Sequence, residues 1–176
     1  MTSEILKKLV EKSLKSLSGD WIIIGGTVLP LLNADYRTTV DIDMIPMNED
    51  SNNSTLALME LASSLGLPIE SINSAGLFFL KKIPNWQQRL QLHAQSKKCR
   101  IFIPNFDLYL ELKISRLSES DFTDIQAYLK WHRDHDKAID QDIALNILKD
   151  AIDTAKDSNR KTKLRDLKES LREFKT

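Results

Sequence analysis

The apolar residues of the chain recur with two different periods. Residues 3–17 place their apolar side chains on one helical stripe, opposite lysines and glutamates, which predicts an amphipathic helix. Four consecutive apolar residues at 21–24 are typical of a buried strand. From residue 106 onward the period is helical almost to the C-terminus. The pattern therefore predicts an α/β core that is followed by helices.

Polar loops and turn residues divide the first part into further elements. We expect a short helix after the glycine pair at 25–26 and a second strand at 40–45. The remaining expected elements are a helix at 55–65, one or two strands within 68–80 that include 77–80, a short helix or irregular segment at 87–92 and a strand at 100–103. Together they predict a small mixed sheet with helices mainly on one side.

The second part should be helical throughout. Its apolar spacing predicts helices at 107–117, 121–131, 138–155 and 161–174. The composition shifts near residues 131–136, so we expect a core over residues 1–131 and a helical C-terminal extension over 132–176. In that extension we expect one buried stripe, formed by Ile139, Ile143, Ile147 and Leu148.

Length and charge narrow the class of protein. A chain of 176 residues fits one domain, or a compact domain with a helical appendage. Its 25 Lys and Arg balance 25 Asp and Glu, so a contact with nucleic acid would depend on local patches. The single cysteine, Cys99, excludes an internal disulfide. With no apolar run long enough for a membrane span and no signal-peptide pattern, we expect a soluble, cytoplasmic protein.

Two features of the first part carry candidate chemistry. Residues two apart on a strand share a face, so Asp41 and Asp43 should point the same way. Two such carboxylates repel each other unless a cation lies between them, and their oxygens suit a hard cation such as Mg²⁺. A helix that starts after Gly25 and Gly26 aims free N–H groups at a phosphate, which glycine allows to approach closely. This combination is the minimum apparatus for phosphoryl or nucleotidyl transfer.

A family resemblance rests on three motifs in this order: Gly25-Gly26, Arg37-Thr38-Thr39 and Asp41-Ile42-Asp43. In this the chain resembles the DNA polymerase β-like nucleotidyltransferase superfamily, in particular its small bacterial branch of abortive-infection (AbiEii-like) toxins. The resemblance implies transfer of a nucleotidyl group from a nucleoside triphosphate, with Mg²⁺ or Mn²⁺, to an acceptor hydroxyl. Asp41 and Asp43 would hold the metal, and Gly25, Gly26 and Thr27 would seat the β,γ-phosphates.

Arg37 lies just before the aspartate pair. From this loop its guanidinium could bind a phosphate with two hydrogen bonds. The alternative is an ion pair with Asp35 or Asp41, and both contacts could coexist. Thr39 belongs to the same matched motif, and we expect it at the site as well.

A second segment, residues 103–128, resembles the same branch. There the resemblance implies that Lys113 binds the nucleotide's phosphates, that Arg116 assists, and that Asp121 and Asp124 orient them. The alternative is that Lys113 and Arg116, three apart on a helix, form a solvated basic face. Arg89 matches an arginine of the branch, but the sequence predicts no role for it.

One departure from the superfamily leaves a second class of function open. A third carboxylate normally comes from a neighbouring central strand, but the strand expected at 77–80 carries no acid. Glu70 precedes that strand, and Glu111 lies in an expected helix. The chain could therefore be a nucleotide-binding or protein-interaction module, such as a toxin–antitoxin component with a cognate antitoxin. As an enzyme, its acceptor could be RNA, a protein or a small molecule.

Overall fold

The structure is a computed structural model that describes residues 3–34, 41–47 and 51–174. It divides into two compact units, Met1–Pro104 and Asn105–Thr176. The boundary expected after residue 131 falls inside a continuous helix, α6 (Glu119–Asp134). The shift in composition near residue 131 reflects exposed charged side chains, whereas the two units are defined by packing.

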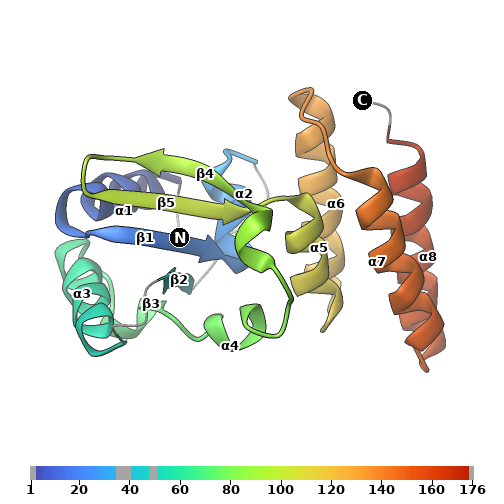
Figure 1. The fold of residues 1–176 in the computed structure, drawn as a ribbon, viewed down its shortest axis with the longest axis horizontal. Coiled ribbons are helices and arrows are strands. Elements are labelled where there is room, and N and C mark those ends of the chain that lie inside the picture. Colours follow the sequence, from blue (N-terminus) through green and yellow to red (C-terminus); the bar gives the residue numbers. More distant parts are fainter. Residues whose placement is uncertain (1–2, 35–40, 48–50, 175–176) are drawn as a thin grey trace. The chain divides into compact units, whose positions relative to one another are not determined.

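The first unit is built on a five-stranded mixed sheet with the order β3-β2-β1-β5-β4 (Figure 1). The central strand β1 pairs antiparallel with β2 and parallel with β5. Its outer pairs are parallel β2–β3 and antiparallel β4–β5. The strands are β1 (Gly19–Ile24), β2 (Ile42–Pro46), β3 (Ile72–Asn73), β4 (Leu90–Gln95) and β5 (Cys99–Pro104). The α/β class with a small mixed sheet is thus confirmed.

Two long helices pack on one face of this sheet. The hydroxyl of Ser13 in α1 lies 4.0 Å from the sulfur of Met44 in β2. On the same face, Ala57 of α3 lines a pocket together with Trp21 and Pro46, which are paired across β1 and β2. The helical segments of this unit are α1 (Ser3–Ser16), η1 (Gly25–Thr27), α2 (Val28–Leu31), α3 (Ser51–Ser64), η2 (Ile69–Ser71), α4 (Leu77–Leu80) and η3 (Trp86–Arg89).

The prediction of a strand at residues 77–80 is wrong, because these residues form the helical turn α4. A run of four apolar residues fits a buried strand and a helical turn equally well. Here Leu80 is buried, but Phe78 and Phe79 are 64% and 53% exposed. The place beside β2 in the sheet is taken by β3, which has only two residues.

The second unit is helical, as the apolar period predicts. It consists of α5 (Phe106–Ile114), α6 (Glu119–Asp134), α7 (Gln141–Thr154) and α8 (Ser158–Arg172). Each helix begins after a side chain that accepts a backbone N–H: Asn105, Ser118, Asp140 and Asp157. Among the residues that the structure describes, no helix is both long and apolar enough to cross a membrane.

The buried stripe expected in the extension is displaced. Ala144 and Leu148 are buried in α7, and the burial of Leu148 is confirmed. Ile147 is half-buried, and Ile143 is 44% exposed, so the burial expected for Ile143 is wrong. The cap at Asp140 starts the helix at Gln141, which leaves Ile139 outside it. Ala144 and Leu148, four residues apart, then form the buried face.

Candidate functional site

The end of β1 brings the first glycine of the motif against the second aspartate. Ile24, the last residue of β1, is paired with Asp43 of β2. Gly25 follows with a φ of 74°, a conformation that L side chains rarely adopt. A Cβ added at Gly25 would lie 2.9 Å from Oδ2 of Asp43. Glycine is therefore required here both by the backbone angle and by the close approach of the carboxylate.

The other end of the glycine turn meets the first aspartate. The hydroxyl of Thr27 donates to the backbone oxygen of Asp41, at 3.2 Å. Asp41 directly precedes β2 and is exposed, whereas Asp43 and Gly26 are half-buried. The structure thus brings together Gly25, Gly26, Thr27, Asp41 and Asp43, and we call these five residues the candidate site.

The helix expected after the glycines is short. Residues Gly25–Thr27 form a 3₁₀ turn, and the α-helix that follows it, Val28–Leu31, has a single turn. A phosphate at this position would therefore be bound by N–H groups of the turn itself rather than by a long helix.

The strand beside β2 carries an amide where a third carboxylate could lie. Asn73 of β3 is paired with Asp43, and directly paired residues share a face of the sheet. The side-chain oxygen of Asn73 accepts the backbone N–H of Ala75, at 3.0 Å. Asn73 could not be recognised from the sequence, because a strand of two residues has no readable period.

The donor set of the candidate site fits a hard divalent cation. Among the described residues no group of three or more His, Cys, Asp or Glu side chains is placed to hold a metal ion. The carboxylate of Asp43 lies against the glycine turn, and Asp41, two residues earlier, meets the same turn through its backbone oxygen. Mg²⁺ is commonly held by one or two carboxylates together with substrate phosphates, so Asp41 and Asp43 suit such an ion.

Two residues of the predicted site, Arg37 and Thr39, lie outside the described residues. Arg89 ends the 3₁₀ turn η3, directly before β4, and is half-buried. Arg89 belongs to the first unit, whereas Lys113, Arg116, Asp121 and Asp124 belong to the second.

Those four residues of the second unit form one ion-pair cluster between α5 and α6. The ammonium of Lys113 donates to Oδ1 of Asp121 at 3.1 Å and to Oδ2 of Asp124 at 2.6 Å. Arg116 donates twice to Asp121, from Nε and Nη2, each at 2.7 Å. Lys113, Asp121 and Asp124 are buried, while Arg116 is exposed. Lys113 therefore does not form the solvated basic face that its sequence spacing allows.

Asp121 is held strongly in its charged form. Burial alone would raise its pKa, but hydrogen bonds from Arg116 and Ser118 and the charge of Lys113 outweigh burial and lower the pKa far below its usual range. Ser118 also forms a capping box with Asp121 at the start of α6. The carboxylate of Asp121 thus links the helix cap to the ion-pair cluster.

This pKa predicts a loss of stability in acid. Since the pKa of Asp121 is lower in the folded chain than in the unfolded one, its contribution is present above about pH 4 and is lost as the pH falls further. Urea unfolding between pH 7 and pH 3 should show a steeper decline for the wild type than for Asp121→Asn. Equal pH dependence of the two proteins would show that Asp121 is not the group responsible.

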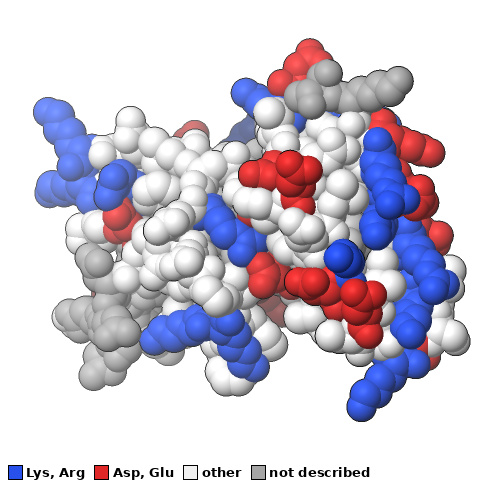
Figure 2. Space-filling model, turned by 45° about the vertical axis from the view of Figure 1, so that its right-hand side comes forward, with Lys and Arg blue, Asp and Glu red and all other residues white. Residues whose placement is uncertain are grey.

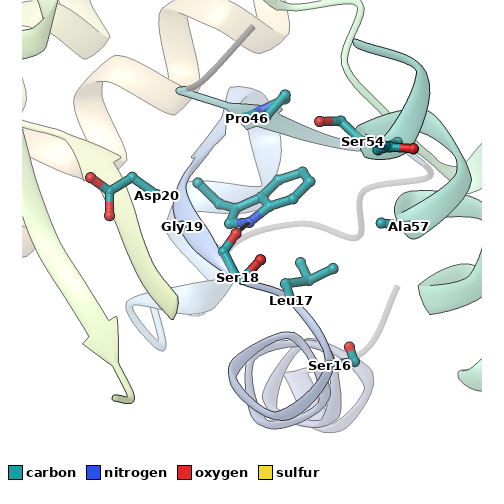
Figure 3. A pocket seen from close by; sticks show the side chains of 10 residues that line it. Ser16, Leu17, Ser18, Gly19, Asp20, Pro46, Ser54 and Ala57 are labelled. Carbon is teal, nitrogen blue, oxygen red and sulfur yellow. Dashed lines mark hydrogen bonds between the residues drawn. The ribbon is translucent and has the colours of Figure 1, made fainter. Parts of the chain in front are cut away.

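A separate pocket lies at the opposite end of β1 from the candidate site. It has a volume of about 380 Å³, and Figure 3 shows Leu17, Ser18, Pro46, Ser54 and Ala57 around it. The indole N–H of Trp21, another lining residue, donates to the backbone oxygen of Ser18 at 2.9 Å. Because the pocket adjoins the start of β1 and the candidate site adjoins its end, the pocket is not part of that site.

A comparison with protein families assigns the chain to the nucleotidyltransferase class. A sequence model of the family described as "nucleotidyltransferase of unknown function" (DUF6036) matches residues 2–176. The chain belongs to this family. No curated protein and no solved structure matches the chain.

Proposed function

We propose that the protein transfers a nucleoside monophosphate from a nucleoside triphosphate to an acceptor hydroxyl, with Mg²⁺ or Mn²⁺. We further propose that it belongs to the AbiEii-like branch and acts in the cytoplasm. The observation that carries the proposal is the close approach of Gly25 to the carboxylate of Asp43. It supports the proposal because glycine lets a phosphate approach the backbone closely.

Each residue of the candidate site has a proposed role. Asp41 and Asp43 hold the metal, and Gly25, Gly26 and Thr27 seat the β,γ-phosphates. A metal bound here would neutralise charge on the α-phosphate and on the leaving pyrophosphate. Arg37 is proposed to bind a phosphate, and Thr39, from the same motif, is proposed to belong to the site. The protein's part is then positioning and electrostatic stabilisation.

The roles of the second segment stay predictions. Lys113 and Arg116 are proposed to bind the nucleotide's phosphates, with Asp121 and Asp124 orienting them. The ion-pair cluster supports the orienting role, since both carboxylates contact Lys113. It equally supports a purely structural role, in which replacement of Lys113 lowers the free energy of unfolding.

A second candidate function is a binding module that retains the fold without turnover, such as a toxin–antitoxin component with a cognate antitoxin. The observation that favours it is Asn73, an amide at the position beside Asp43 where a third carboxylate could lie. Such a protein would bind Mg²⁺ and triphosphate but release no pyrophosphate.

Joint binding of Mg²⁺ and triphosphate tests the proposed function. We expect each alone to bind weakly and the two together to stabilise the fold by roughly 2.7 kcal/mol when the ligand is at about a hundred times Kd. Asp43→Asn removes one negative charge at nearly constant shape. It should leave the unliganded protein as stable or more stable, because repulsion from Asp41 is relieved, and it should abolish the joint effect.

Thermal melts with and without Mg²⁺ and each triphosphate measure this. Asp153→Asn, at an exposed position of α7, is the matched control and should keep the joint stabilisation. A structural Asp43 would behave in the opposite way: Asn would destabilise the unliganded protein, and wild type would show no joint effect to lose.

A further inference from the structure

Two exposed aromatic side chains lie on α4, close to the candidate site. Phe78 and Phe79 are 64% and 53% exposed, and their ring centroids are 5.5 Å apart at an angle of 82°. The ammonium of Lys82 lies 3.9 Å from the centroid of Phe78 and 5.8 Å from that of Phe79. Lys81, next to it, is also exposed. We call these four residues the α4 surface.

The α4 surface is attached to the strand that carries Asp43. A Cβ added at Gly76, directly before α4, would lie 3.4 Å from Cβ of Asp43 and 2.5 Å from Cδ1 of Ile24. No side chain fits between this turn and the sheet. Consecutive Cα atoms are 3.8 Å apart, so the Cα of Phe78 is within roughly 8 Å of the Cα of Gly76. The start of α4 therefore lies beside the strand that carries Asp43.

We propose that the α4 surface binds the unpaired end of a nucleic acid strand. Aromatic rings that face solvent can stack with bases of any sequence, and adjacent lysines attract the phosphates of the same strand. Lys82, placed over both rings, supplies a cation where a base and its phosphate would lie together. This inference rests on the proposed function for its catalytic meaning: the strand's terminal hydroxyl is the acceptor.

Because of the charge distribution of the protein, a nucleic acid strand needs a local group of basic side chains to bind. The chain has no net charge. On the face drawn in Figure 2, uncharged and acidic side chains separate several groups of Lys and Arg. A polyanion is therefore attracted to individual basic groups rather than to the molecule as a whole. The α4 surface combines such a group with exposed rings, whereas the exposed apolar residues Leu56 and Met59 of α3 carry no ring.

Binding of short, fluorescently labelled single-stranded RNA and DNA tests the proposal without any nucleotide chemistry. In fluorescence anisotropy, we expect the wild type to bind at least one of the two with an affinity that falls as salt rises. Phe78→Ala with Phe79→Ala should weaken binding roughly tenfold or more, since stacking on one ring contributes about 1–3 kcal/mol. Lys81→Gln with Lys82→Gln should weaken binding and also reduce its salt dependence.

Two matched double variants serve as controls. Leu56→Ala with Met59→Ala removes exposed apolar area on α3, and Lys97→Gln with Lys98→Gln removes two exposed lysines from the β4–β5 turn. Both should bind the oligonucleotides as wild type does. Because the lysine variant of α4 leaves both rings in place, it keeps the test valid even if the double alanine variant does not fold.

The outcomes separate this inference from the proposed function. The joint stabilisation by Mg²⁺ and triphosphate should persist in both α4 variants, because neither alters the candidate site. Oligonucleotide binding through α4 without that stabilisation would support the surface and contradict the proposed function. The inference is overturned if wild type binds neither oligonucleotide, or if the α4 variants bind as wild type does. It is also overturned if the phenylalanine changes alter the oligomeric state of the protein but leave oligonucleotide binding unchanged. That result would show that α4 forms a contact between protein chains.

Discussion

Replacing Lys113 with methionine should lower the free energy of unfolding by about 3–5 kcal/mol, the typical loss when one partner of a buried ion pair is removed. Its ammonium contacts the carboxylates of Asp121 and Asp124, both completely buried. Methionine fills a similar volume but leaves two buried negative charges, of which Asp121 keeps its ion pair with Arg116. Urea unfolding at pH 7 measures the loss.

A matched control distinguishes the loss of a buried ion pair from the loss of an exposed one. Lys130→Met, on α6, also removes an ion pair, with Asp134, but both side chains are largely exposed. It should cost no more than about 0.5 kcal/mol. Adding Asp124→Asn to Lys113→Met should recover part of the loss, since one of the unpaired charges is then removed. Similar small losses for Lys113→Met and Lys130→Met would contradict the structural role of the cluster.

Gly25→Ala should both destabilise the protein and abolish its binding of Mg²⁺ and triphosphate. The positive φ of Gly25 costs alanine about 1–2 kcal/mol. In addition, the new Cβ would lie 2.9 Å from the carboxylate of Asp43, so that the carboxylate or the turn must move. A displacement of this size at a metal ligand should remove the joint stabilisation, which thermal melts with both ligands measure.

Gly66→Ala isolates the backbone effect. Gly66 has a φ of 68°, close to that of Gly25, but a Cβ there would meet nothing within 4 Å. It should therefore show the backbone cost alone and keep the full joint stabilisation. If both variants retained that stabilisation, the contact between Gly25 and Asp43 would have no part in ligand binding.

The sequence was sufficient to predict that the glycine turn and the aspartates lie close together. A buried strand, a glycine pair and a strand with Asp-x-Asp follow one another within a short stretch, and short connections favour neighbouring strands. Antiparallel pairing of β1 with β2 then places Ile24 opposite Asp43. Helices α6, α7 and α8 of the second unit could also be predicted, because each is long enough to show the period of its apolar residues.

Other parts depend on contacts that have no signature in the sequence. The run at residues 77–80 forms a helical turn directly after Gly76, which packs against Ile24 and Asp43. Asn73 comes beside Asp43 through a strand of two residues. The burial of Lys113 depends on the acids of α6, which lie 8 and 11 positions further along the chain. Spacing within α5 alone could not reveal these partners.

Release of pyrophosphate tests the proposed nucleotidyl transfer most directly. Purified protein is incubated with Mg²⁺, each triphosphate in turn and single-stranded RNA or DNA as acceptor, and pyrophosphate is measured together with transfer of label from the α-phosphate. We expect release that needs Mg²⁺ and is lost in Asp43→Asn but retained in Asp153→Asn. Release that is equal in Asp43→Asn and wild type would contradict the assignment of the site. Joint stabilisation by Mg²⁺ and triphosphate without pyrophosphate release, whatever acceptor is supplied, would contradict the enzyme and favour the binding module.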